Sequence, residues 1–249
     1  VLMIEFDPIR YQSFFEQMPK PSINFFVYNR RKPAFWNFQS YNLIKQSECI
    51  VETENSLSDA SFKKIVSDGR LQMEAKISDL FSEESFFKSF FSIGGVSFWS
   101  TFKSFFQKFL RKRAFEFIVE IELTKKLMEK YHFSSILILS EAGSNEKIAL
   151  QLAHQRQIPV CLVQHGINYN TKESYDMNVA KGALPIKSDH FLCWGKIGEE
   201  FSQSMGINVE KVHSIGSPIF DRLRFDEHDS LKNDCVLLAP AGPTKEHAS

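Results

Sequence analysis

Residues 134–166 decide the fold, and they read SSILILSEAGSNEKIALQLAHQRQIPVCLVQHG. The segment contains two nearly continuous apolar runs, residues 134–140 and 159–164, which are typical of parallel strands covered by helices on both faces. Between them, apolar residues recur with helical spacing, for example at Ile148 and Leu152. A strand, a helix and a second parallel strand form a right-handed crossover unit. The sequence therefore predicts an α/β protein with a Rossmann-like parallel sheet.

The turns that follow these two strands carry the first candidate site residues. In an open parallel sheet, ligands bind beyond the carboxyl ends of the strands. The residues at that edge are Glu141, Gly143, Ser144, Gln164, His165 and Gly166.

His165 is the candidate catalytic base, because a neutral imidazole suits proton transfer near pH 7. The alternative is that His165 only ends its strand with a hydrogen bond to the backbone. Glu141 is the second candidate catalytic residue, predicted either to orient His165 or to bind an acceptor hydroxyl. The alternative is that it is a solvated loop acid. Gln164 and Gly166 flank the histidine and are predicted to contact the substrate.

Gly143 and Ser144 open the predicted helix of this unit. The free N–H groups at a helix start can hold an anion, which would make both residues part of a substrate site. An ordinary serine N-cap explains the same sequence equally well.

A second strand–helix–strand unit precedes the first, with predicted strands at residues 23–28 and 47–51. Its first turn carries the cations Arg30 and Arg31, which are predicted to bind an anionic substrate because they lie at the carboxyl end of a strand. A solvated loop is the alternative. Residues 1–20 are predicted to be mainly helical.

Residues 56–130 are predicted to form a helical insertion. Phe98, Phe102, Phe105 and Phe109 recur with helical spacing, and lysine and arginine residues lie beside them. This stripe could belong to an interfacial helix on an anionic membrane. The alternative is core packing, which is the more frequent role of a phenylalanine-rich stripe.

Later residues complete the first domain, predicted to span residues 1–225. Apolar runs at 189–194 and 212–215 predict further strands, with a helix between them. The turn after the second run carries the predicted hinge residues Gly216, Pro218 and Asp221.

Residues 226–233 are charged and read as a linker. The apolar run that follows has nothing after it to cover it. Residues 234–249 are therefore expected to be the first strand of a second, truncated carboxyl-terminal domain.

Composition narrows the functional class. The chain has 249 residues, of which 43% are hydrophobic and 24% are charged. Its formal net charge is zero, and this balance argues against a nucleic-acid partner bound through bulk positive charge. Its cysteines are widely spaced and form neither a metal-binding pattern nor a disulfide framework. Reduced cysteines indicate a cytoplasmic protein. If the aromatic stripe is an interfacial helix, the protein is expected to lie at the inner face of the membrane. Neither a metal nor a cofactor is predicted.

Four short segments occur in a characteristic order: VQHG at 163–166, SDHF at 188–191, IGSPIFDRL at 215–223 and VLLAP at 236–240. The series resembles the amino-terminal half of GT-B-type transferases of surface-polymer synthesis, in particular CDP-glycerol glycerophosphotransferases and capsule-polysaccharide glycosyltransferases. The resemblance covers residues 134–240. The chain departs from the glycerophosphotransferase pattern at Gln164, where a tryptophan is expected, and has Ser217 at a variable position.

The resemblance implies two Rossmann-like domains, with His165 facing the cleft between them and the Gly-x-Pro-x-x-Asp segment leading to the domain crossover. It implies transfer of a sugar or polyol phosphate from a nucleotide-activated donor to a growing surface glycan. The donor-binding residues would lie in the carboxyl-terminal domain. The present chain would then hold the acceptor side and be inactive alone.

Two other functions remain open from the sequence. A nonhydrolysing UDP-sugar 2-epimerase shares the two-domain fold and would convert a free UDP-sugar without any acceptor. A non-catalytic glycan-binding or scaffolding half would bind glycan, and its binding would survive replacement of His165.

Overall fold

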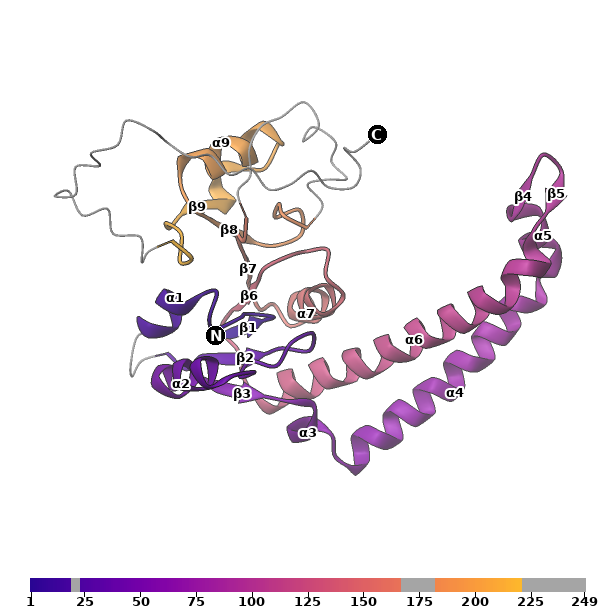
Figure 1. Cartoon of the computed structure of the whole chain (residues 1–249), viewed down its shortest axis with the longest axis horizontal. Coiled ribbons are helices and arrows are strands. Elements are labelled where there is room, and N and C mark those ends of the chain that lie inside the picture. The colour runs from indigo at the N-terminus through magenta and orange to yellow at the C-terminus, as the bar shows by residue number, and fades with distance from the viewer. Residues whose placement is uncertain (19–22, 167–181, 221–249) are drawn as a thin grey trace.

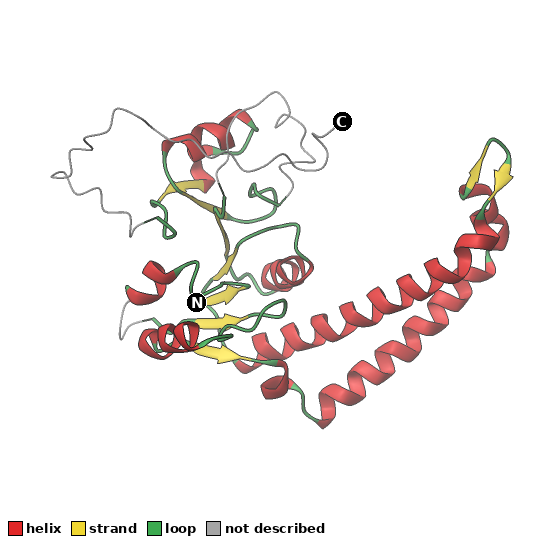
Figure 2. Ribbon diagram, in the orientation of Figure 1, coloured by secondary structure: helices red, strands yellow, loops and turns green. Residues whose placement is uncertain are grey.

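A seven-stranded parallel sheet forms the centre of the protein (Figures 1 and 2). The computed structural model describes residues 1–18, 23–166 and 182–220, and the statements below concern these residues. The strand order is β3-β2-β1-β6-β7-β8-β9, and every neighbouring pair is parallel. The strands are β1 (Leu2–Ile4), β2 (Phe26–Tyr28), β3 (Ile50–Glu52), β6 (Ile136–Ile138), β7 (Val160–Val163), β8 (His190–Cys193) and β9 (Val212–Ser214).

The predicted crossover unit is confirmed. Strands β6 and β7 pair in parallel, with Ile136 opposite Val160, and helix α7 (Ser144–Gln155) connects them. The predicted α/β class with a Rossmann-like parallel sheet is therefore correct. The strands are shorter than the apolar runs that predicted them.

The amino terminus differs from the prediction. Residues 1–20 were expected to be mainly helical, but Leu2–Ile4 is the fully buried strand β1, and only α1 (Gln12–Glu16) is helical. Strand β1 lies between β2 and β6, so both edges of its backbone are paired. Pairing on both sides and burial on both faces outweigh local helix preference in so short a segment.

Strand β1 also marks the point where the strand order reverses. The chain continues from β1 to β2 and β3 on one side, then crosses to β6 and the remaining strands on the other. In open α/β sheets this topological switch point, outside the carboxyl ends of the strands, is the usual ligand crevice.

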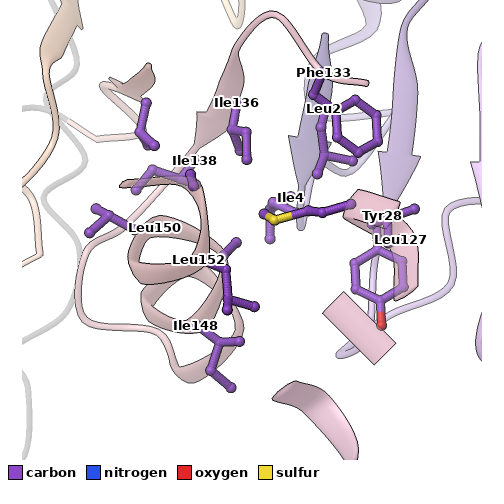
Figure 3. Close-up of a cluster of buried hydrophobic side chains, with 14 of the residues drawn as sticks. Leu2, Ile4, Tyr28, Leu127, Phe133, Ile136, Ile138, Ile148, Leu150 and Leu152 are labelled. Atoms are coloured by element: carbon purple, nitrogen blue, oxygen red, sulfur yellow. The ribbon is translucent and has the colours of Figure 1, made fainter. Parts of the chain in front are cut away.

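Helices cover the two faces of the sheet. On one face, Leu2 and Ile136 pack with Leu127 of α6 (Trp99–Lys130) and with Ile148 and Leu152 of α7 (Figure 3). The opposite face packs against α1 and α2 (Phe38–Ser47). The remaining helices of the sheet domain are α3 (Glu54–Leu57), α9 (Lys196–Ser204) and the short 3₁₀ helix Val209–Lys211.

The predicted helical insertion is a long hairpin that projects away from the sheet (Figure 1). It consists of α4 (Ala60–Ser82), α5 (Glu84–Phe90) and α6, with a short antiparallel β-hairpin between α5 and α6. The two strands of that β-hairpin are β4 (Ser92–Ile93) and β5 (Val96–Ser97). The carboxyl end of α6 returns to the main core through Leu123 and Leu127. No helix in the described part of the chain is long and apolar enough to cross a membrane.

The aromatic stripe of α6 divides between two environments. Phe102 and Phe106 pack against a buried cluster at the far end of the hairpin, whereas Phe98, Phe105 and Phe109 are exposed. Core packing, the alternative interpretation from the sequence, therefore accounts for Phe102 and Phe106 but not for the three exposed phenylalanines.

The predicted linker, the strand expected within residues 234–249, and Asp221 all lie outside the described residues.

Candidate functional site

Glu5 occupies the centre of the switch point, immediately after β1. Its φ of 62° lies in the left-handed region, which is uncommon for a residue other than glycine. Such backbone strain persists only where surrounding contacts hold it, and it clusters at functional sites.

The Glu5 carboxylate connects three elements of the fold. Its side chain is only 4% exposed. Oε1 accepts hydrogen bonds from the backbone N–H of Arg30 (2.9 Å) and from the side-chain amide of Asn145 (2.7 Å). The backbone N–H of Arg31 donates to both carboxylate oxygens at 3.2 Å, and Arg31 Nε lies 3.4 Å from Oε2. Glu5 thus ties the carboxyl end of β1 to the turn after β2 and to the start of α7.

A second buried carboxylate, Glu146, lies beside Glu5 in the first turn of α7. The guanidinium of Arg31 donates to Glu146 Oε1 and so bridges the two acids. Burial raises the pKa of Glu146, and the negative charge of Glu5 adds to that increase, while its own backbone N–H and Arg31 oppose it. Oε2 of Glu146 is buried and has no hydrogen-bond partner among the described residues.

The carboxylate of Glu146 lies at the predicted anion site formed by Gly143 and Ser144. Gly143 is the N-cap of α7 and Ser144 its first residue, so the serine is not the cap. A Cβ at position 143 would meet the carboxyl group of Glu146, which would have to shift to make room. The helix start therefore already faces a carboxylate of the protein, which disfavours an exogenous anion there.

Arg30 is engaged by carboxylates of the protein. Its guanidinium forms a two-pronged contact with Glu120 of α6, at 2.9 and 2.8 Å, and pairs with Glu54 at 2.9 Å. The predicted substrate contact of Arg30 is replaced by a link between the β2 turn and the helical hairpin. Arg31 is also engaged by carboxylates, those of Glu5 and Glu146, but its side chain is 56% exposed.

The Arg30–Glu120 contact yields a prediction. A double-mutant cycle with Arg30→Ala and Glu120→Ala should give a coupling energy of about 1–3 kcal/mol in urea unfolding, because both partners are mostly buried. The exposed pair Arg113–Glu116 is the matched control, and its coupling should be about 0.3–0.5 kcal/mol. Equal coupling in the two cycles would contradict the role of Arg30 as a link to the hairpin.

His165 follows β7 at the same edge of the sheet and is half-buried. Burial lowers the pKa of His165, as do the positive charges of Arg10 and Arg31, against a hydrogen bond from the ring to the Leu139 carbonyl that raises it. The imidazole is therefore neutral at pH 7. One ring nitrogen donates to Leu139, and the other carries the lone pair that can accept a proton.

Arg10 positions the His165 segment. Its guanidinium donates to the backbone carbonyl of His165 at 2.6 Å, and the residue is exposed. The structure thus brings together His165 after β7, Arg31 after β2, and Arg10 from the turn that precedes α1.

Glu141 does not join this group. Its buried carboxylate accepts hydrogen bonds from the backbone N–H groups of Lys187 (3.0 Å) and Ser188 (2.6 Å). These bonds hold the segment that leads into β8. The expectation that Glu141 orients His165, or is a solvated loop acid, is thus replaced by a role in positioning that segment.

Gln164 connects the ends of β7 and β8. Its Oε1 accepts from the backbone N–H of Trp194 and its Nε2 donates to the Gly166 carbonyl, both at 2.8 Å. Gln164 also lines a cavity of about 490 Å³. The other lining residues are Trp194, Gly195, Lys196, Ile197, Gly198 and Phe220.

The predicted hinge is described only in part. Gly216 has a φ of 84°, a conformation that favours glycine. Pro218 lines a small apolar cavity of about 150 Å³ together with Tyr11 and Val163.

Sequence reasoning missed Glu5, Arg10, Glu146 and Trp194. The available signal for Glu5 was the apolar run of residues 1–4 ending on an acid, which resembles the end of a buried strand. No group of three or more metal-binding side chains occurs in the described ranges.

Comparison with known proteins gives structural neighbours only. No family model matches the chain, and no curated protein matches it. One similar structure is UDP-GlcNAc 2-epimerase from Neisseria meningitidis bound to UDP-GlcNAc, with a TM-score of 0.48, 10% identity, and coverage of 88% of this chain and 46% of that one. Another is UDP-N-acetylglucosamine 2-epimerase from Rickettsia bellii, with a TM-score of 0.43, 10% identity, and coverage of 89% and 46%. The chain thus spans less than half the length of either structure.

Proposed function

We propose that the chain is part of an enzyme that uses a nucleotide-activated sugar or polyol phosphate, and that it transfers this group to a glycan acceptor in surface polysaccharide synthesis. The observation that carries the proposal is the neutral His165 beside Arg10 and Arg31 at the switch point of a parallel sheet. The order of the sequence motifs supports the same class.

His165 has the properties of a general base in such a transfer. An acceptor hydroxyl attacks the anomeric carbon or the phosphorus of the donor, and the bond from that atom to the leaving nucleotide breaks. The hydroxyl proton passes to the free ring nitrogen of His165, and the bonding electrons leave with the nucleotide. A base with a lowered pKa is unprotonated and ready at pH 7.

The two arginines supply positive charge where the substrate carries negative charge. Arg10 is exposed and Arg31 half-exposed, so each can approach a phosphate. Arg31 is held in place by Glu5 and Glu146, which orients its guanidinium before a substrate arrives.

The cavity beside Gln164 suits the acceptor. Trp194 and Phe220 meet edge to face, with ring centroids 5.4 Å apart, and give the cavity an aromatic wall. Flat aromatic surfaces pack well against the apolar faces of sugar rings. Gln164 lines this cavity and directly precedes His165 in the chain.

The proposal predicts nucleotide release that depends on acceptor. The full-length protein should be incubated with UDP-, CDP- and GDP-activated donors, with and without a glycan acceptor, and the released nucleotide measured. Transfer requires that nucleotide release from one donor rise strongly when acceptor is added, and that the product glycan gain the mass of the transferred sugar or polyol phosphate.

The other outcomes assign the other functions. Conversion of a UDP-sugar to its 2-epimer without acceptor would replace transfer by epimerisation. Glycan binding with no turnover of any donor, unchanged in His165→Ala, would identify a non-catalytic binding module.

A further inference from the structure

The far end of the helical hairpin carries apolar side chains that the protein does not cover. Ile93 and Val96, on either side of the Gly94-Gly95 turn, are 77% and 72% exposed, and Phe90 is 69% exposed. We use the name tip surface for the exposed apolar residues at this end. They are Phe86, Phe90, Ile93, Val96, Phe98, Phe105 and Phe109.

A buried aromatic cluster supports the tip surface from inside. Trp99 is 1% exposed and stacks on Phe87, with ring centroids 4.6 Å apart, and on Phe91, at 5.2 Å. Phe81 lies parallel to Trp99 at 6.0 Å. The inner aromatic residues therefore form the core of the hairpin end. The exposed residues of the tip surface are not needed for that core and are available to bind a partner.

The hairpin end is also positively charged. Residues 85–113 contain six lysine and arginine residues and no aspartate or glutamate. The facing segment, residues 74–84, contributes four acidic residues and one lysine, so residues 74–113 keep a net charge of +3 in a chain whose net charge is zero. Five of the six cations of residues 85–113 lie within 4.0 Å of a carboxylate: Lys88 and Lys103 of Glu84, Arg111 of Glu74, and Lys112 and Arg113 of Glu116. Most of these pairs are at least one-third exposed, so their cations can also reach an anionic surface.

We propose that the tip surface docks onto an anionic lipid bilayer, with Ile93, Val96 and Phe90 entering the acyl boundary and the surrounding cations facing lipid phosphates. Exposed aromatic and branched apolar side chains with a basic rim are the combination that binds such an interface. A second copy of the chain fits less well, because two tip surfaces would bring like charges together. The hairpin contacts the bilayer by its end, which differs from a helix that lies flat.

The hairpin geometry suits this role. Helix α6 has 32 residues, so it is roughly 48 Å long at about 1.5 Å per residue. It runs without a break from the tip surface to Leu123 and Leu127 in the core of the sheet domain. A docked tip would therefore hold the sheet at a fixed distance from the membrane (Figure 1).

Vesicle sedimentation of the whole chain tests the proposal. The protein should sediment with vesicles of phosphatidylcholine mixed with phosphatidylglycerol at low salt, and less with pure phosphatidylcholine or at high salt. The double variant Ile93→Ser/Val96→Ser should lower the partition coefficient at least about tenfold. Lys108→Gln/Lys112→Gln should lower it about fivefold per cation.

Phe38→Ser is the matched control, because Phe38 is 78% exposed but lies on α2, and its partition should equal that of the unaltered chain. Circular dichroism should show all variants folded, since none of the altered side chains belongs to a buried cluster. Absence of binding to the phosphatidylglycerol vesicles at low salt would overturn the proposal. Self-association that Ile93→Ser/Val96→Ser abolishes, without vesicle binding, would also overturn it and assign the tip surface to a second copy.

Discussion

Replacing His165 with alanine in the full-length protein should lower the rate of transfer by about 10²–10⁴-fold, the range expected for loss of a general base. The melting temperature should hardly change. His165 is only half-buried, and Arg10 reaches its segment through the backbone carbonyl, which the variant keeps. Near-normal turnover by His165→Ala would exclude His165 as the base.

The pH dependence distinguishes a base from a residue that merely shapes the site. The value of kcat/KM should rise with pH as His165 loses its proton, with a midpoint below the ordinary histidine pKa of about 6.5, because burial and the charges of Arg10 and Arg31 lower the pKa of His165. Arg10→Gln removes one of those charges, so the midpoint should move to higher pH. An unchanged midpoint in Arg10→Gln would contradict the assignment of the rise in kcat/KM to the deprotonation of His165.

The sheet was predictable where apolar runs were long and clearly bounded. The apolar runs at residues 134–140 and 159–164 predicted β6 and β7. Because the second run ends just before His165, it also predicted that His165 lies at the end of a strand. Strand β1 was missed because its apolar run is only four residues long and is followed by residues such as Phe14 and Phe15 that suggest a helix. Its strand conformation comes from pairing with β2 and β6, which are distant in sequence.

The partners of charged residues were not predictable from local sequence. Arg30 and Arg31 are adjacent and looked equivalent, yet Arg30 pairs with Glu120, ninety positions away, while Arg31 pairs with Glu5 and Glu146 at the switch point. Likewise, an acid in a strand–helix turn fits either catalysis or loop positioning. Only the backbone donors of Lys187 and Ser188 assign Glu141 to the second role in this structure.

The hairpin shows the limit of periodicity as a signal. Helical spacing correctly placed the phenylalanines of α6 on a helix, but it could not separate Phe102, which packs inward, from Phe105, which is exposed. That division depends on where α4 and α5 lie against α6, and a one-dimensional pattern does not contain this information.

Glu5→Ala should be the most destabilising single change at the switch point, at about 3–5 kcal/mol, because it leaves three donors without their acceptor at about 1–3 kcal/mol each. The substitution leaves the backbone N–H of Arg30 and the amide of Asn145 without their acceptor, and it takes one of two carboxylates from Arg31. For a protein of this size, such a loss corresponds to a decrease in melting temperature of roughly 6–20 °C.

Two further variants separate the contributions of Glu5. Glu5→Gln keeps an oxygen for the N–H donors but loses the charge that faces Arg31, so its melting temperature should fall between those of Glu5→Ala and the unaltered protein. Glu200→Ala removes an exposed acid paired with Lys196 at 3.7 Å and should change stability by no more than about 0.5 kcal/mol. If Glu5→Ala melted as Glu200→Ala does, the carboxylate would not be what holds β1, the β2 turn and α7 together. Glu146 would then be the carboxylate that holds the guanidinium of Arg31 in its orientation toward a substrate.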